Sequence, residues 1–329
     1  MRSINNLKHR LPVLAIDLGG TKIISAVVSP DGQLIAKERS LTLADEGQAS
    51  VINRLLLAID HLLKLKNTDS SQLDSISIAA AGGIDIKKGL VTSSPHLPGW
   101  HNVPLRDIVR DKYQVGTFLL NDASAAALGE HRFGAGRGVN NLVLLTIGTG
   151  IGGGIIIDGR LYHGPSGSAG EFGHTTIDIN GPKCSCGNVG CLEMLVSGMA
   201  MAREAKRRIN QGERSSLVEM VGGKIEEITA QEIGAAARGG DSLALDIITE
   251  AATYLGVGLV NLVNTFNPEM IIIGGAVAKL GDLLLDPARR LVKERAFPIS
   301  AQAVRIVPAQ LGDEAGLLGA AVFALEQKN

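Results

Sequence analysis

The sequence has few aromatic residues, almost no net charge and no long uninterrupted apolar run. Aromatic side chains make up 3% of the 329 residues, and the formal net charge is −1. A balance this close to neutral gives no electrostatic reason to expect nucleic acid or an anionic membrane as a partner. The apolar run near the N-terminus ends at Asp17, too early for a signal-peptide core or a membrane span. We therefore expect a cytoplasmic protein.

Cysteine is also scarce, and its distribution indicates a metal site. The chain has three cysteines, Cys184, Cys186 and Cys191, all within eight residues, and His174 precedes them. An odd number of cysteines packed so closely is a poor disulfide framework but suits a metal-ligand cluster. Three thiolates and one imidazole form a closed tetrahedral set, which zinc favours and which leaves no open position for water. We predict a structural Zn²⁺ site, with free buried thiols as the alternative.

Glycine, in contrast, is abundant at 41 residues, and much of it lies in a pattern that occurs twice. Residues 11–40 and residues 141–164 both read as strand, glycine turn, strand, Asp-Gly turn, strand. The length allows two domains, and the recurrence predicts two related halves that face each other across a cleft. Leucine, isoleucine and alanine spacing predicts helices at about 47–66, 191–210, 241–265 and at the C-terminal end of the chain.

The second glycine turn formally matches the dinucleotide fingerprint G-x-G-x-x-G at residues 148–153. That fingerprint needs a helix after the glycines, whereas here a β-branched run leads into a hairpin turn, so we reject this interpretation. No Walker A loop occurs either. What remains is two glycine hairpins able to direct backbone N–H groups at phosphate, or, alternatively, two ordinary tight turns. Asp17, at the end of the first strand, is suited to hold a hydrated Mg²⁺ ion.

These motifs resemble a known family. "DLGGTK" at 17–22 and "GTGIGGG" at 148–154 are similar to the two phosphate motifs of actin-like sugar kinases, and "GEFGH" and "CSCGNVGCLE" resemble the ROK family of repressors, open reading frames and kinases. The resemblance implies an α/β fold with two RNase H-like domains, at 12–121 plus 314–329 and at 122–313, and ATP as the nucleotide. It places nucleotide contacts at Asp17, Gly19, Gly20, Thr21, Lys22, Gly148, Thr149, Gly150, Gly152, Gly153, Gly274 and Gly275, and a further nucleoside-binding turn at Gly312-Asp313. Lys22 is alternatively a solvated charge at the start of a strand.

A sugar kinase must orient a hydroxyl toward the γ-phosphoryl group and offer it a proton acceptor. The resemblance implies that Asp122 is the base and that Asn121 binds a neighbouring hydroxyl of the sugar. The alternative is that this pair only caps the alanine-rich helix that comes next.

The resemblance also assigns sugar contacts within and near the cysteine cluster. It implies contacts from Glu171, His174 and Glu193, and close approach of the backbone at Gly83. His174 can bind zinc through one ring nitrogen and a sugar hydroxyl through the other. His96 stands where the family often has asparagine, and is either a sugar contact or a surface residue.

We therefore expect an ATP-dependent kinase that phosphorylates the 6-hydroxyl of glucose. "HLPGWHNVPL" resembles the glucokinase branch, and the alternative substrates are N-acetylmannosamine, another N-acetylhexosamine or fructose. A sugar-sensing repressor is a further alternative, although such relatives carry a winged-helix domain and only twelve residues precede Val13 here. A non-catalytic sugar sensor is the third. The family leads us to expect a homodimer or homotetramer, and the near-neutral charge leads us to expect no nucleic-acid or membrane partner.

Overall fold

The computed structural model describes residues 10–327. Asn141–Gly153 and Glu171–Ala309 form one compact unit, which we call the second unit, and the rest of the described chain forms the first. Residues 328–329 of the predicted C-terminal segment, and the first nine residues of the N-terminal stretch considered as a signal peptide, lie outside the described residues.

The first unit is built on a five-stranded sheet in which three strand ends meet at one edge. The order is β3-β2-β1-β4-β8, and β1 pairs antiparallel with β2 but parallel with β4, which pairs parallel with β8. Because the carboxyl ends of parallel strands lie at the same edge of a sheet, Asp17 near the end of β1 and Asn121 at the end of β8 lie along the same edge. The strands are β1 (Val13–Leu18), β2 (Lys22–Val28), β3 (Leu34–Leu41), β4 (Ser75–Ala80) and β8 (Thr117–Asn121).

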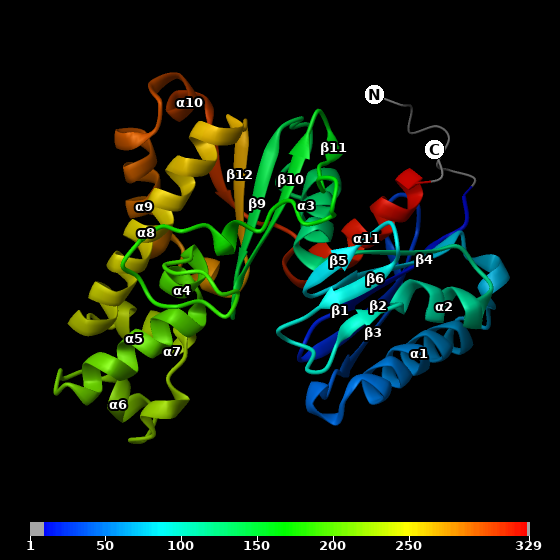
Figure 1. The fold of residues 1–329 in the computed structure, drawn as a ribbon, viewed down its shortest axis with the longest axis horizontal. Helices are drawn as coiled ribbons and strands as arrows, with labels where there is room; N and C mark the ends of the chain where they lie inside the picture. The colour runs from blue at the N-terminus through cyan, green and yellow to red at the C-terminus, as the bar shows by residue number, and fades with distance from the viewer. Residues whose placement is uncertain (1–9, 328–329) are drawn as a thin grey trace. The chain divides into compact units, whose positions relative to one another are not determined.

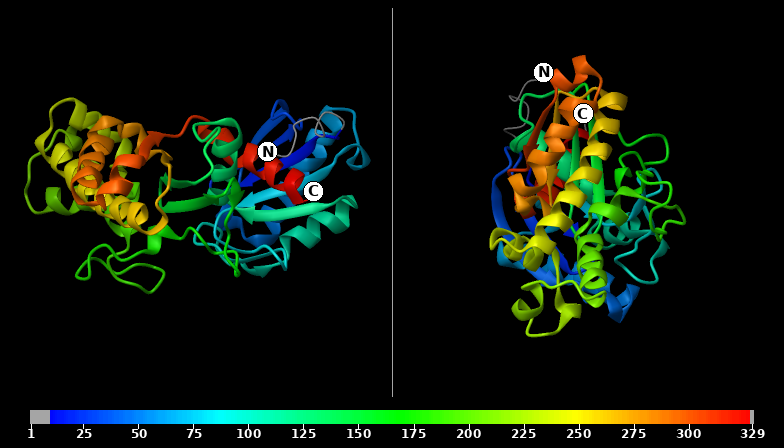
Figure 2. Two further views of the ribbon diagram at one scale, coloured as in Figure 1. Left: turned by 90° about the horizontal axis from the view of Figure 1, so that it is seen from above. Right: turned by 90° about the vertical axis from the view of Figure 1, so that its left-hand side faces the viewer.

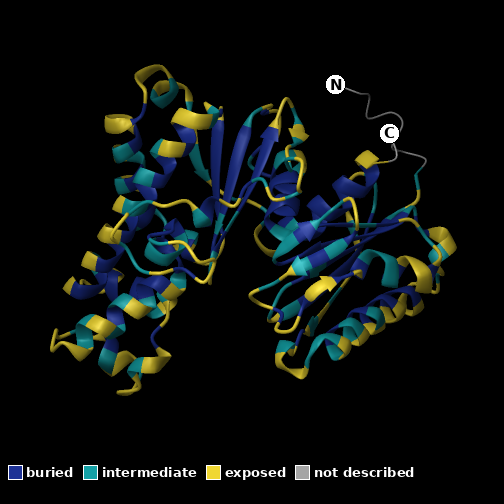
Figure 3. Cartoon of the chain, in the orientation of Figure 1, coloured by how far each residue is buried: buried dark blue, intermediate teal, exposed yellow. Residues whose placement is uncertain are grey.

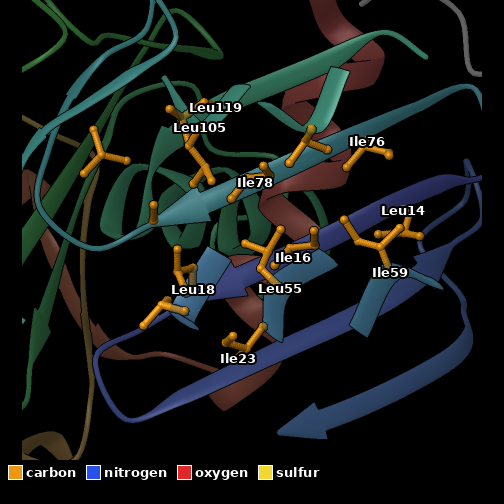
Figure 4. Close-up of a cluster of buried hydrophobic side chains, with 14 of the residues drawn as sticks. Leu14, Ile16, Leu18, Ile23, Leu55, Ile59, Ile76, Ile78, Leu105 and Leu119 are labelled. Carbon is orange, nitrogen blue, oxygen red and sulfur yellow. The ribbon is translucent and has the colours of Figure 1, made fainter. Parts of the chain in front are cut away.

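Helices cover both faces of this sheet (Figure 1). On one face, Leu55 and Ile59 of α1 (Gln48–Leu65) pack with Ile16 and Ile78 in a buried apolar cluster, to which α2 (Leu105–Tyr113) adds Leu105 (Figure 4). Successive side chains of a strand point to opposite faces, so Asp17 points away from this cluster. It meets α11 (Ala315–Gln327) on the other side.

Helix α3 (Asp122–Phe133) belongs to the first unit, whereas the sequence-based boundary assigned it to the second domain. The reason is its packing against α11, where the two backbones approach so closely that a methyl group on Gly319 would lie 1.6 Å from the carbonyl oxygen of Ala125. A small three-stranded sheet, which no sequence pattern predicted, comes after β4 in the chain. Its strands are β5 (Gly83–Asp85), β6 (Leu90–Ser93) and β7 (His101–Val103).

A second five-stranded sheet repeats the order of the first. Its order is β11-β10-β9-β12-β13, which confirms the repeat predicted from the sequence. The three central strands of each sheet are largely buried, whereas β3, β11 and β13 at the edges are not, and the other exposed residues gather in loops and on outer helix faces (Figure 3). The strands are β9 (Leu142–Ile147), β10 (Ile151–Ile157), β11 (Arg160–Leu161), β12 (Met270–Gly274) and β13 (Arg305–Pro308).

The helix predicted at about 191–210 is two helices, α4 (Leu192–Val196) and α5 (Gly198–Asn210). Ser197 between them has an extended conformation, and its side chain accepts a hydrogen bond from the N–H of Ala200, so it ends one helix and caps the next. The remaining helices are α6 (Leu217–Met220), α7 (Ala230–Arg238), α8 (Ser242–Phe266), α9 (Asp282–Arg295) and α10 (Pro298–Ala303). Short 3₁₀ helices lie at Ala44–Glu46, Ser70–Gln72, Phe172–His174, Ile225–Glu227, Val277–Leu280 and Gly312–Glu314.

Helix α8 is the one helix within residues 10–327 that is long and apolar enough to cross a membrane, by length and composition only. A search for uninterrupted apolar runs misses it, because polar residues interrupt its sequence. Most of its apolar stretch is buried, as in the core helix of a globular protein. Helix α9 runs beside it, drawn orange next to yellow in Figure 2, and a methyl group on Gly256 would lie 2.8 Å from the Leu291 side chain.

Candidate active site

The first glycine turn is held by a buried threonine that lies outside the motif. The N–H of Gly19 donates to the carbonyl of Lys22 at 3.0 Å, closing the turn between β1 and β2. Thr42 braces it twice, because its hydroxyl donates to the Gly19 carbonyl at 2.7 Å and its N–H donates to the Thr21 carbonyl at 3.0 Å. Gly20 has no room for a side chain, since an added methyl group would lie 2.7 Å from the His96 carbonyl oxygen.

Negative charge accumulates beside this turn. The pKa of the Asp17 carboxyl is raised to about 7 by burial first, then by the charges of Asp122 and Asp313, and Lys22 opposes the shift. The ammonium of Lys22 lies 2.6 Å from a carboxylate oxygen of Asp313, so the lysine is ion-paired rather than simply solvated. Oxygen-rich acidic sites of this kind are suited to Mg²⁺.

Asn121 and Asp122 start α3 at the end of β8. The side-chain oxygen of Asn121 accepts the N–H of Ser124 at 3.0 Å, so Asn121 does cap the helix, as one of the two interpretations predicted. Its amide nitrogen donates to the carbonyl of Gly82 at 3.1 Å, which ties the helix start to the turn before β5. Two of its hydrogen-bonding groups are thus already used for structure, and its contact with a sugar stays a prediction.

The Asp122 carboxylate is the group predicted to act as the base. One oxygen accepts the N–H of Ala123 at 2.8 Å. Burial raises the pKa of the Asp122 carboxyl, while this hydrogen bond and the nearby His96 imidazole oppose the rise. His96, the residue that departs from the family pattern, is exposed and lies near enough to Asp122 to affect the pKa of its carboxyl. A carboxylate with a raised pKa is a better proton acceptor for a hydroxyl than an ordinary one.

Gly83, predicted to approach the sugar, is constrained by protein contacts as well. The Thr92 hydroxyl donates to its carbonyl at 3.0 Å, and a methyl group on Gly83 would lie 2.6 Å from that hydroxyl oxygen. Gly82 has a φ of 111°, which L-residues with side chains rarely adopt. The pair is therefore needed to begin β5, whatever its role toward a ligand.

The second glycine turn leads into a strand, which confirms that it is not a dinucleotide fingerprint. The N–H of Gly148 donates to the Gly150 carbonyl at 2.9 Å, and β10 starts at Ile151. The Glu193 carboxylate, predicted only as a sugar ligand, accepts the N–H of Ile151 at 2.7 Å. A methyl group on Gly150 would lie 2.4 Å from the same carboxylate oxygen. Glu193 thus supports the turn directly.

The four predicted zinc ligands come together. The sulfur of Cys184 lies 3.7 Å from Nδ1 of His174, and the sulfurs of Cys186 and Cys191 are also 3.7 Å apart. All four ligand atoms lie within 4.8 Å of one another. A tetrahedral zinc with bonds of about 2.3 Å to sulfur places sulfur atoms about 3.8 Å apart, so the donor set fits this ion. Burial, followed by the neighbouring thiols, raises the pKa of the Cys191 thiol to about 12.

His174 and Glu171 lie at the two ends of one short turn. The 3₁₀ helix Phe172–His174 closes with the N–H of His174 donating to the Glu171 carbonyl at 3.1 Å. Because Nδ1 of His174 faces Cys184, Nε2 is the nitrogen left for a ligand. Phe172 packs on Phe266 of α8 with ring centroids 5.8 Å apart, which anchors the turn in the second unit.

The predicted nucleoside-binding glycines have a packing role too. Gly275 comes directly after β12 with a φ of 87°, and a methyl group on it would lie 2.3 Å from the Ile147 carbonyl oxygen at the end of β9. The predicted residues therefore form two groups. Gly83, Asn121, Asp122 and the turn at Asp17–Lys22 lie in the first unit, and the turn at 148–153, Gly274, Gly275, Glu171, Glu193 and the cysteine cluster lie in the second.

Known proteins resemble this chain over almost its whole length. Residues 13–327 match the ROK family. The chain belongs to the ROK family. It is 38% identical to a glucokinase from Thermotoga maritima over 97% of this chain and 98% of that one. A crystal structure of a ROK family glucokinase from Streptomyces griseus, in complex with glucose and AMPPNP, superposes with a TM-score of 0.83 at 36% identity, covering 96% of this chain and 99% of that chain.

ROK proteins also include regulators similar to this chain. A xylose repressor from Caldicellulosiruptor bescii is 36% identical over 93% of this chain, which spans 76% of the repressor's length. Similarity to ROK proteins therefore assigns the family and the actin-like ATPase fold, and the chemistry must be argued from the site.

Proposed function

We propose that this chain is an ATP-dependent hexokinase that phosphorylates the 6-hydroxyl of glucose, with Asp122 as the base. The observation that carries the proposal is Asp122 itself, a carboxylate with a raised pKa at the end of β8, next to a second such carboxylate, Asp17. A repressor that only senses sugar needs neither a proton acceptor such as Asp122 nor a carboxylate suited to Mg²⁺, such as Asp17, near it. The similarity to glucokinases, one of them bound to glucose and AMPPNP, favours glucose among the hexoses.

The proposed reaction transfers one phosphoryl group. The Asp122 carboxylate accepts the proton of the 6-hydroxyl, the sugar oxygen forms a bond to the γ-phosphorus, and the bond to the bridging β,γ-oxygen breaks, so ADP leaves with that electron pair. The proposal assigns the phosphate oxygens to Lys22 and to N–H groups of the glycine turns other than those of Gly19 and Gly148, which close the turns. It assigns the sugar hydroxyls to Glu171, Nε2 of His174 and the second carboxylate oxygen of Glu193.

Two metal ions belong to the proposal. Asp17 would hold a hydrated Mg²⁺, which supplies charge neutralisation for the phosphates of ATP. His174, Cys184, Cys186 and Cys191 would hold Zn²⁺, and this closed ligand set suits a structural ion that fixes the orientation of the His174 ring. Removal of zinc is expected to unfold this loop and lower the affinity for sugar, without changing the identity of the base.

The first experiment is ADP release by the purified, zinc-loaded protein with Mg-ATP and a panel of sugars: glucose, mannose, fructose, N-acetylglucosamine and N-acetylmannosamine. Asp122→Asn keeps the shape of the side chain and leaves the Asn121 cap in place, so it should fold and lose about 10²- to 10⁴-fold in kcat. Asp107→Asn is a matched control, since Asp107 also lies in the first turn of a helix of the first unit. It should behave as wild type.

The outcomes separate the candidate functions. Turnover that is strongest with glucose supports the proposal, and turnover that is strongest with an N-acetylhexosamine or fructose assigns one of the alternative kinases. A folded, zinc-loaded protein that turns over no sugar contradicts kinase activity and leaves sugar sensing as the better account. Light scattering of the same sample tests the expected homodimer or homotetramer, and cell fractionation tests the expected cytoplasmic location.

A further inference from the structure

A buried carboxylate outside the predicted site holds one segment of chain in place. Glu130, in the last turn of α3, has a relative exposure of 0%. One of its carboxylate oxygens accepts the N–H groups of Gln310 at 2.9 Å and Leu311 at 2.7 Å. The other accepts the N–H of Ala135 at 2.8 Å. A carboxylate is costly to bury, and these three backbone donors offset that cost.

The segment held by Glu130 is the point where the chain passes from one unit to the other. The second unit ends at Ala309, whose N–H donates to the carbonyl of Ile273 at 2.9 Å. The very next two N–H groups, those of Gln310 and Leu311, donate to Glu130 in the first unit. Consecutive residues at this crossing are therefore hydrogen-bonded, each within its own unit.

Beyond this crossing, the chain leads straight to the proposed nucleotide side of the site. The turn Gly312–Glu314 carries Asp313, whose carboxylate lies 2.6 Å from the ammonium of Lys22. Three residues later, Gly316 brings α11 against Asp17, where an added methyl group would lie 3.2 Å from a carboxylate oxygen. The positions of Asp313 and Gly316 thus depend on where residues 310 and 311 are held.

The chain after α3 is shaped around this carboxylate as well. A methyl group on Gly134 would lie 2.0 Å from an oxygen of Glu130, so only glycine leaves the carboxylate its position. The backbone carbonyl of Glu130 also accepts the N–H groups of Gly134 at 3.0 Å and Gly136 at 2.9 Å. An amide in place of the carboxylate would turn an NH₂ group toward at least one backbone N–H, which cannot accept it.

We propose that Glu130 is a positioning residue for nucleotide binding: it fixes residues 310–313, so that Asp313 holds Lys22 beside Asp17. This role rests on the proposed function, because it assumes that Asp17 and Lys22 face the phosphates and the cation of ATP. Glu130 itself touches neither substrate nor the reacting atoms.

The test compares Glu130→Gln with Glu314→Gln in the full-length, zinc-loaded protein. Glu314 lies in the same turn as Asp313 but pairs with exposed Lys37 at 2.9 Å, so it is the matched control. Two measurements are made: steady-state kinetics gives the KM values for Mg-ATP and for glucose, and calorimetry gives the dissociation constant of AMPPNP. We expect Glu130→Gln to weaken nucleotide binding about tenfold, equivalent to about 1.4 kcal/mol, in both KM and dissociation constant. The KM for glucose and all constants of Glu314→Gln should stay within about twofold of wild type.

A third measurement is hydrogen exchange at residues 310 and 311. Gln310 is exposed, so slow exchange of its amide in wild type, and faster exchange in Glu130→Gln, would report the carboxylate bond directly. If the variant does not fold, hydrogen exchange of the wild-type protein tests the proposal instead. Amides of residues 310 and 311 that exchange as fast as those of an open loop would overturn it.

The remaining outcomes separate this proposal from the proposed function. Unchanged nucleotide affinity in a folded Glu130→Gln protein overturns the positioning role while leaving kinase activity intact. Equal losses of affinity for ATP and for glucose would show that Glu130 has only a general structural role, and would also overturn the positioning role. Wild type that turns over no sugar but binds AMPPNP contradicts the kinase function, and the ratio of the two AMPPNP dissociation constants still decides the role of Glu130. Wild type that does not bind AMPPNP overturns both.

Discussion

Gly150 offers a sharp test of the link between the second glycine turn and Glu193. A methyl group on Gly150 would lie 2.4 Å from the carboxylate oxygen that accepts the Ile151 N–H at 2.7 Å. Ordinary contacts of such a carbon begin at about 3.4 Å, so in Gly150→Ala the carboxylate must retreat by about 1 Å, which takes the hydrogen bond beyond useful length. The variant should therefore lose this bond.

The size of the loss depends on the charge of the acceptor. A hydrogen bond to a charged group contributes about 1.5–3 kcal/mol, which corresponds to roughly 10- to 150-fold in a rate or equilibrium constant. Because the displaced carboxylate also belongs to the proposed sugar contacts, kcat/KM for glucose should fall by an amount in this range. The ADP-release assay with Mg-ATP and varied glucose measures it, and thermal unfolding shows whether the variant is folded.

A double-mutant cycle isolates the cause. In a Glu193→Ala background the methyl group at position 150 has no carboxylate to displace, so Gly150→Ala should cost much less there, with a coupling energy of about 1–3 kcal/mol. Gly148→Ala is the control, because a methyl group at Gly148 meets no atom within 4 Å, and its effect should simply add to that of Glu193→Ala. Equal losses for Gly150→Ala in both backgrounds would refute the reasoning.

Three further predictions concern the first unit. Asp17→Asn should abolish turnover yet stabilise the protein in magnesium-free buffer, because burial raises the pKa of Asp17 to about 7, so that between about pH 4 and pH 7 the carboxyl ionises in the unfolded chain but not in the folded one. This penalty on folding levels off above about pH 7, so the gain, up to about 4 kcal/mol at about pH 8, should shrink as the pH falls toward about 4, and urea unfolding at several pH values measures it. Thr42→Val should cost about 1–3 kcal/mol and raise the KM for ATP, because it leaves the Gly19 carbonyl without its 2.7 Å donor, whereas Thr249→Val, on the exposed face of α8, should do neither. Asn121→Ala should lower the free energy of unfolding by about 1 kcal/mol through loss of the α3 cap, and a larger loss of kcat/KM than of stability would show that Asn121 also contacts substrate.

The sequence predicted the elements that local patterns determine. The strand at residues 13–18 and the helix at Gln48–Leu65 arise from β-branched runs and from leucine at helical spacing, which need no knowledge of distant residues. The repeat of strand order in the two sheets was predictable for the same reason, since each half carries its own hairpin signals. The C-x-C-x₄-C spacing of the cysteines did bring the ligand atoms together, because a short loop limits where they can lie.

The features that the sequence did not predict depend on contacts between residues far apart in the chain. Lys22 and Asp313 are separated by 291 positions, and Glu130 and Gln310 by 180, so no local pattern indicates either bond. The place of α3 in the first unit results from its packing on α11 at Gly319, at the other end of the chain. Thr42 gave no signal at all, because a single threonine near a glycine turn is unremarkable until its hydroxyl is seen on the Gly19 carbonyl.

Several glycines of the predicted nucleotide site leave room for protein atoms, although Gly148 does not. Gly20 lies against the His96 carbonyl, Gly150 against the Glu193 carboxylate and Gly275 against the Ile147 carbonyl. At these three positions glycine is required by packing within the protein, whereas phosphate binding depends on where the N–H groups point. Alanine substitutions in such turns should thus act first on the neighbours that hold the turn, and Glu193 connects the turn at Gly150 to the loop that carries the zinc ligands.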